Sequence, residues 1–174
     1  MNYASIKNCD VANGIGVRVS LFVSGCTHYC KGCFNSEAWD FDYGDPFDSQ
    51  AQEKVLNLLK PKHISGLTLL GGEPLDPANQ IGLIPFIRKF KQEYPDKTLW
   101  CYSGYTYEYI TDVMFKELPY TKELLSYIDV LVDGKFVEEL KDLRLRFKGS
   151  SNQRIIDIKK SLESNEIVLW EEEK

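Results

Sequence analysis

Three of the five cysteines, Cys26, Cys30 and Cys33, lie together in the segment "SGCTHYCKGCFN". Their C-x3-C-x2-C spacing is typical of thiolates that bind a soft or borderline metal, chiefly an iron–sulfur cluster or zinc. Structural zinc needs four ligands, commonly as two separated pairs. Three cysteines on a four-iron cluster would instead leave one iron open to a substrate, and we favour this interpretation. The alternative is a zinc loop completed by His28 or Cys9.

The other two cysteines are isolated in the sequence. Cys101 falls in a predicted strand, where we expect a small buried side chain rather than a ligand. His28 is expected to be a loop residue near the cluster. An odd count of five cysteines, three of them clustered, favours metal ligation in a reducing compartment over a disulfide framework.

The length of 174 residues predicts one domain over 1–174, with a cluster loop at 25–35 and a peripheral C-terminal segment at 159–174. The chain has 21 basic and 26 acidic residues, a formal net charge of -5, which argues against a nucleic-acid partner. No apolar run approaches the ~20 residues of a membrane span, and the N-terminus lacks a secretory signal pattern. We therefore expect a cytoplasmic protein without a membrane partner.

Apolar runs of strand length alternate with helical patterns along the chain. Strands are predicted at 17–25, 66–72, 97–104 and 128–134, with shorter candidates at 154–158 and 166–170. Helices are predicted at 48–60, 76–94 and 106–118, with Asp48 or Ser49 and then Asp76 as N-caps. This alternation predicts an α/β fold with a mainly parallel sheet. A complete eight-stranded barrel needs about 250 residues, so any barrel must be partial.

Four loops begin where predicted strands end: the cysteine loop, "GGEP", "YSGYTYE" and "DGKF". Ligands of α/β sheets bind at the carboxyl ends of parallel strands, so we expect these loops to converge. Gly71 and Gly72 let the backbone approach a ligand closely, and Glu73 can accept a hydrogen bond from an ammonium group. The alternative for "GGEP" is an ordinary strand-to-helix turn.

The motifs and their order resemble the radical S-adenosylmethionine (SAM) superfamily. More narrowly, "CTHYCKGCFN", "GGEPL", "WCYSGYTYE", "DVLVDGKF" and "FKGSSNQRIID" together resemble the family of activating proteins of anaerobic ribonucleoside-triphosphate reductase. The resemblance spans roughly 10–158, nearly the whole chain. It implies an incomplete (β/α) barrel with a mainly parallel sheet, open on one side.

The resemblance implies a glycyl-radical-enzyme activase. Cys26, Cys30 and Cys33 would hold a [4Fe–4S] cluster whose open iron binds SAM. An electron from the reduced cluster would cleave SAM to methionine and a 5′-deoxyadenosyl radical, which would take a hydrogen atom from a glycine of the reductase large subunit. A reduced flavodoxin-type donor is implied as a partner. No catalytic side chain is expected beyond the cluster and SAM, since such cofactors ask the protein chiefly for orientation.

The resemblance also implies the residues around SAM, which are Gly71, Gly72, Glu73, Ser103, Gly104, Asp133 and Lys135. The "GGEP" loop would hold the SAM amino group, and "DGKF" would reach the ribose or carboxylate. A turn with a solvated lysine is the alternative for "DGKF". Residue 32 is glycine where many superfamily members have an aromatic residue, so adenine recognition is expected from elsewhere, such as Phe34 or the backbone. The nearby tyrosines are expected in the core: Tyr102, Tyr105 and Tyr107.

The segment 143–154 alternates apolar and basic residues and predicts a half-exposed strand with Arg144 and Arg146 on one face. It is either a charged edge strand or a surface that contacts the partner or the site. The residues proposed for site contacts are Ser150, Asn152, Gln153 and Arg154.

Two other functions stay open. One is a small radical SAM enzyme acting on a free metabolite, similar to a deazapurine synthase, for which we identify no substrate pocket in the sequence. The other is a non-enzymatic iron–sulfur or zinc module. A simple electron carrier would normally use four cysteines and would not need "GGEP".

Overall fold

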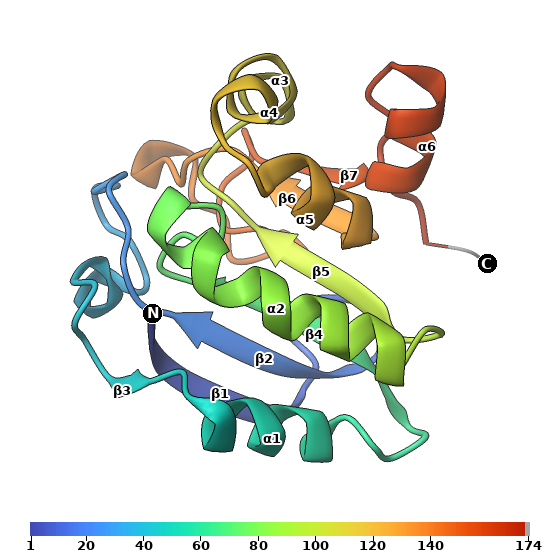
Figure 1. The fold of residues 1–174 in the computed structure, drawn as a ribbon. Coiled ribbons are helices and arrows are strands. Elements are labelled where there is room, and N and C mark those ends of the chain that lie inside the picture. The colour runs from blue at the N-terminus through green and yellow to red at the C-terminus, as the bar shows by residue number, and fades with distance from the viewer. Residues whose placement is uncertain (173–174) are drawn as a thin grey trace.

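The computed structural model describes residues 1–172 and shows one seven-stranded sheet (Figure 1). The strand order is β3-β1-β2-β4-β5-β6-β7. The four central strands are parallel to one another: β2 (Val17–Val23), β4 (Ile64–Gly71), β5 (Thr98–Tyr102) and β6 (Val130–Asp133). The flanking strands are antiparallel to their neighbours: β1 (Asn2–Asp10), β3 (Asp45–Pro46) and β7 (Arg154–Asp157). The predicted α/β class with an open, mainly parallel sheet is confirmed. The sheet does not close, so its barrel character is not confirmed.

Two predicted strands do not form. The segment 143–153 makes turns and a single bridge between Lys141 and Ser150. Its alternating pattern is overridden by a local turn, because the Asp142 carboxylate accepts a hydrogen bond from the Arg144 backbone N–H at 2.9 Å. The candidate at 166–170 is reduced to one bridge, which joins Leu169 to β7. β7 itself confirms the candidate at 154–158.

The two long helices begin at the predicted caps. They are α1 (Ser49–Leu58), capped by Asp48, and α2 (Pro77–Glu93), capped by Asp76. Each aspartate accepts a backbone N–H at 3.0 Å, which satisfies one of the free donors of the first turn. Among the described residues, no helix is both long and apolar enough to cross a membrane.

The predicted helix at 106–118 is built from short pieces, and further short helices follow. They are α3 (Tyr107–Tyr109), the π-turn η2 (Ile110–Met114), α4 (Phe115–Glu117), α5 (Thr121–Tyr127) and α6 (Ile158–Ser164). Two 3-10 turns, η1 (Ser36–Trp39) and η3 (Glu138–Leu140), lie in the loops after β2 and β6.

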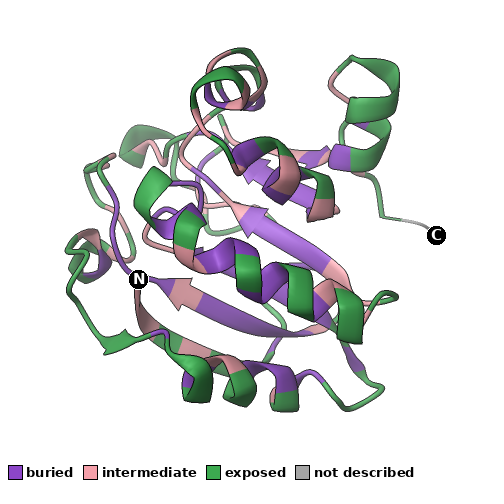
Figure 2. Ribbon diagram, in the orientation of Figure 1, coloured by how far each residue is buried: buried purple, intermediate pink, exposed green. Residues whose placement is uncertain are grey.

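Side chains alternate between the two faces of the sheet and create two cores. On β5, Leu99 and Cys101 belong to the large core under α1, α2 and α5, whereas Trp100 belongs to a smaller core on the opposite face. Figure 2 shows the buried central strands behind α2. Cys101 is fully buried, as predicted, and burial raises the pKa of its thiol. The smaller core is covered by Phe147 and by Trp170, whose ring lies 5.1 Å from that of Trp100.

A fully buried arginine ties three central strands together. Arg18 of β2 donates through Nε to Thr68 Oγ1 at 2.8 Å and through Nη2 to the carbonyls of Leu67 and Thr98. Its Nη1 donates to the Ile15 carbonyl and to Thr98 Oγ1. A guanidinium has five N–H donors, and these five contacts match that number. Burial lowers the pKa of the Arg18 guanidinium.

We expect Arg18→Met to lower the free energy of unfolding by about 3 kcal/mol, because several buried acceptors lose their donor at once. Urea unfolding followed by circular dichroism measures the change. Arg88→Met is the matched control, since Arg88 pairs with Glu123 at the surface and should leave the urea midpoint unchanged. Equal midpoints for the two variants would contradict the structural role of Arg18.

Candidate metal centre

The carboxyl ends of the parallel strands open into one cavity of about 430 Å³. Its wall includes all three clustered cysteines and the residues that end the next strands, which are Gly71, Gly72, Glu73, Ser103, Gly104 and Gly134. The predicted convergence of the strand-end loops is therefore confirmed. The cavity continues along the helix-free face of the sheet, which is the face opposite α1, α2 and α5. There it is lined by Tyr102 of β5 and by Phe147 of the irregular segment 143–153.

The cysteine loop is closed by the turn that follows it. The Gly25 N–H donates to the Ala38 carbonyl at 2.8 Å, and the Cys26 N–H donates to the Trp39 carbonyl at 3.1 Å. These two bonds fix η1 beside the first cysteine. Hydrogen bonds within the protein therefore define the shape of the cysteine loop.

The Cys33 sulfur accepts the Asn35 backbone N–H at 3.4 Å. The backbone of His28 lowers the pKa of the Cys26 thiol, and the backbone of Phe136 lowers that of the Cys30 thiol. Hydrogen bonds to sulfur favour the thiolate, which is the form that binds metal. Burial acts in the opposite direction, raising the pKa of the Cys26 thiol to about 11 and also raising that of Cys30. A bound cation would supply the attraction that makes these groups ionise.

Three free cysteines on one loop are the donor chemistry of an iron–sulfur cluster. The described residues contain no group of three His, Cys, Asp or Glu side chains placed to hold one metal ion. Two residues were considered as the fourth ligand of a zinc site. His28 is hydrogen-bonded to Glu73, and Cys9 is exposed on β1.

The Glu73 carboxylate joins three segments of the site. It is buried, and its Oε1 accepts the Leu75 N–H and the Ser103 hydroxyl, each at 2.9 Å. Its Oε2 accepts the Gly104 N–H at 2.7 Å and bonds His28 Nε2 at 2.8 Å. A carboxylate offers about four acceptor positions, and all four are used here. A ligand amino group that reaches Glu73 must therefore share or displace one of these donors.

The glycine pair before Glu73 lets this loop press against the cysteine loop. A Cβ on Gly72 would lie 2.5 Å from the Gly25 carbonyl oxygen, and Gly71 has a φ of 105°. The same carbonyl accepts the Glu73 N–H at 2.8 Å. "GGEP" is thus a strand-to-helix turn that also forms part of the cavity wall.

His28 links the cysteine loop to the end of β5. Its ring lies 4.5 Å from the ring of Tyr105, and a Cβ on Gly104 would lie 2.4 Å from it. The sequence predicted a loop residue near the cluster, and His28 does line the cavity with the cysteines. Its bond to Glu73 spans 45 positions, and no local pattern indicated it.

Asp133 and Lys135 lie in a second hollow beside the first, and Gly104 and Gly134 line both. Lys135 is exposed, whereas Asp133 is buried. The structure therefore does not bring these two predicted residues into the cavity wall with the cysteines, although the two hollows adjoin.

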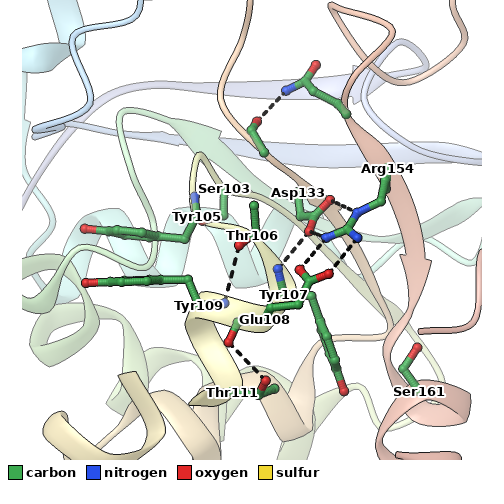
Figure 3. Close-up of polar contacts among 12 residues, drawn as sticks. Ser103, Tyr105, Thr106, Tyr107, Glu108, Tyr109, Thr111, Asp133, Arg154 and Ser161 are labelled. Carbon is green, nitrogen blue, oxygen red and sulfur yellow. Dashed lines mark hydrogen bonds and ion pairs between the residues drawn. The ribbon is translucent and has the colours of Figure 1, made fainter. Parts of the chain in front are cut away.

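Asp133 is bound to Arg154 of β7 (Figure 3). The Asp133 carboxylate accepts from Arg154 Nε at 3.0 Å and from the Tyr107 N–H at 2.8 Å. Arg154 also contacts both carboxylate oxygens of Glu108, at 2.9 and 2.7 Å, and lowers the pKa of Glu108 to about 2. Arg154, a predicted site contact, lines this second hollow and holds Asp133 in place.

The other polar residues of the irregular segment mostly hold its turns. Gln153 lines the cavity and accepts the backbone N–H groups of Gly149 and Ser150 at 2.8 and 3.1 Å. Asn152 donates to the Lys135 carbonyl. Arg144 is exposed and bonds Asp142. The two arginines predicted to share a strand face instead pair separately, because Arg146 contacts Glu172.

Two buried polar atoms of the cavity wall have no hydrogen-bond partner within residues 1–172. They are the indole nitrogen of Trp39 and the hydroxyl oxygen of Tyr102. Buried polar groups are nearly always paired, so the wall is arranged as if a ligand completes it. The sequence predicted Tyr102 only as a packing residue, and it gave no prediction for Trp39. Tyr107, by contrast, is buried in the large core as predicted.

Comparison with known proteins assigns the chain to a class of domain. A family model described as a 4Fe-4S single cluster domain matches residues 12–156. The chain therefore belongs to the family of 4Fe-4S single cluster domains.

The particular family follows from three relatives, each named anaerobic ribonucleoside-triphosphate reductase-activating protein. The relative from Haemophilus influenzae is 46% identical over 157 residues, covering 89% of this chain and 97% of its own. The one from Pasteurella multocida is 45% identical, with 89% and 96% covered. The one from Enterobacteria phage T4 is 39% identical over 155 residues, with 89% and 93% covered. The chain belongs to the family of anaerobic ribonucleoside-triphosphate reductase-activating proteins.

We expect Glu73→Gln to lower the free energy of unfolding by about 3 kcal/mol and to reduce iron retention after reconstitution. The amide NH₂ group would face donors in place of an acceptor, which leaves buried N–H groups unpaired. Iron content and urea unfolding measure the two effects. Glu37→Gln is the control, because Glu37 is an exposed glutamate of η1 close to the same loop. Wild-type iron content in Glu73→Gln would contradict this role.

Arg154→Met should destabilise the protein by about 3 kcal/mol, since it leaves the buried Asp133 carboxylate without its cation. The double variant Asp133→Asn/Arg154→Met should recover part of the loss, because the buried charge is then removed as well. Thermal unfolding of the two variants measures the difference. If the double variant is less stable than the single one, the buried charge is not the cause.

Proposed function

We propose that this chain is a radical SAM enzyme that activates an anaerobic ribonucleoside-triphosphate reductase. The observation that carries the proposal is the shared cavity, in which Cys26, Cys30 and Cys33 face the glycine-rich ends of β4 and β5. The three cysteines would ligate a [4Fe–4S] cluster and leave one iron open for SAM. The names of the relatives support the reductase as partner.

The strand-end loops would hold SAM beside the cluster. Gly71, Gly72 and Glu73 would face its amino group, and Ser103 and Gly104 would approach it from positions fixed by the Glu73 carboxylate. When bound, the reduced cluster and SAM would supply an electron transfer that yields methionine and a 5′-deoxyadenosyl radical, which takes a hydrogen atom from a glycine of the reductase. No side chain of this chain is assigned a proton transfer.

We assign different tasks to the two "DGKF" residues. Asp133 would hold the loop through Arg154, while Lys135 would reach the SAM carboxylate or ribose. Lys135 favours the charged form of Cys30 through its own positive charge, which supports a position near the cluster.

The nucleoside end of SAM needs a different partner from the usual aromatic residue. Gly32 packs against the Glu138 side chain, which a Cβ would approach to 2.7 Å. Phe34 packs on Phe136, with ring centroids 5.1 Å apart. We assign the unpaired Tyr102 hydroxyl to the nucleoside, because it is the buried polar group on the helix-free part of the cavity wall.

A protein loop as the substrate is supported by the apolar residues of the cavity wall. Phe34 and Leu143 line the cavity, yet they are 55% and 84% exposed. Exposed apolar side chains that gather at one site are typical of surfaces that bind another protein. We propose a reduced flavodoxin-type protein as electron donor, and the free thiols suit the reducing cytoplasm.

Anaerobic reconstitution with iron and sulfide, followed by reduction in the presence of SAM, tests the reaction. We expect methionine and 5′-deoxyadenosine to form, and to fall at least 100-fold in Cys30→Ala together with the iron content. Cys101→Ala is the control and should retain both, since Cys101 lies in the core. Adding the reductase should produce a glycyl radical signal in electron paramagnetic resonance. Absence of SAM cleavage in the wild type would refute the proposal, and cleavage without a glycyl radical would favour a metabolite enzyme.

A further inference from the structure

We infer that the indole N–H of Trp39 donates a hydrogen bond to a sulfur of the bound cluster and thereby raises its reduction potential. The inference rests on the cluster-binding part of the proposed function. It does not depend on SAM cleavage or on the reductase.

The first observation is the unpaired donor. Trp39 lines the same cavity as the three cysteines, and its indole nitrogen is buried with no acceptor among the described residues. An indole N–H can only donate. Because a buried N–H is rarely left without a partner, the wall needs an acceptor at this position.

The second observation is that Trp39 is fixed against the cysteine loop at two points. Its carbonyl accepts the Cys26 N–H at 3.1 Å. Its ring meets the ring of Tyr29 edge-to-face, with centroids 5.2 Å apart and planes at 82°. Tyr29 stands between Cys26 and Cys30 in the loop. Both the backbone and the ring of Trp39 are therefore positioned by residues next to the proposed ligands.

The third observation concerns the available acceptors. The Glu73 carboxylate already accepts four donors, so it is not the missing partner. A cluster held by the three cysteines would bring negatively charged sulfur to the wall that Trp39 shares. The cysteine thiolates and the bridging sulfides offer the same chemistry, and an N–H donor suits either.

The consequence is electronic. Reduction adds a negative charge to the cluster, and hydrogen bonds to its sulfurs are among the factors that set its potential. A donor at Trp39 would stabilise the reduced form more than the oxidised form. This would add to the Asn35 backbone N–H, which already donates to the Cys33 sulfur.

Hyperfine spectroscopy of the reconstituted, reduced protein without SAM tests the contact directly. With ¹⁵N in the tryptophan indoles, we expect a ¹⁵N coupling to the electron spin of the cluster. The coupling should disappear in Trp39→Phe and persist in Trp100→Phe. A redox titration should give a more negative midpoint potential for Trp39→Phe at equal iron content, and a wild-type potential for Trp100→Phe.

The chain has three tryptophans, so a second variant covers the case in which Trp39→Phe loses iron. The double variant Trp100→Phe/Trp170→Phe keeps Trp39 as its only indole. A persisting ¹⁵N coupling in that variant supports the inference, and its loss overturns it. An unchanged coupling or potential in iron-loaded Trp39→Phe also overturns it. If the wild type assembles no cluster, the proposed function fails first, and iron analysis shows this separately.

Discussion

The geometry of the cavity depends on one buried carboxylate. Glu73 receives donors from its own turn, from the end of β5 and from the cysteine loop. Bonds to a buried charge are stronger than bonds between neutral groups. A single acidic side chain therefore sets the spacing between the loop that holds the cysteines and the loops proposed to hold SAM.

The two faces of the sheet have different structures, and this difference positions the cavity. The helices cover one face and complete the large core. The other face is covered by turns of the irregular segment and by Trp170, which leave room beside Tyr102 and Phe147. Arg18 keeps the central strands in register beneath this thinner cover, since its donors reach two neighbouring strands.

Local signals in the sequence were sufficient for much of the fold and the site. The cysteine spacing, the caps at Asp48 and Asp76 and the strand-end glycines are short patterns with a direct physical cause. The structure has both caps, and it brings the cysteines and the strand-end glycines to one cavity. β1 was not predicted, because its residues are mostly polar and only partly buried. The strand predicted at 143–154 was wrong because the Asp142 turn outweighs alternation. The pairs His28–Glu73 and Asp133–Arg154 join distant segments, so no window of sequence contains them.

The contact between Gly72 and the Gly25 carbonyl has a consequence for the order of folding. The three cysteines are close together in the sequence, but the residues that form the cavity wall around them come from distant segments. The contact between Gly72 and Gly25 exists only once β2 and β4 have paired in parallel. Parallel pairing across a long connection forms slowly compared with local structure. Small zinc domains gain their fold from the metal, whereas here the pocket is completed by the chain. We therefore expect the proposed cluster to be inserted late, into a polypeptide whose sheet is already assembled.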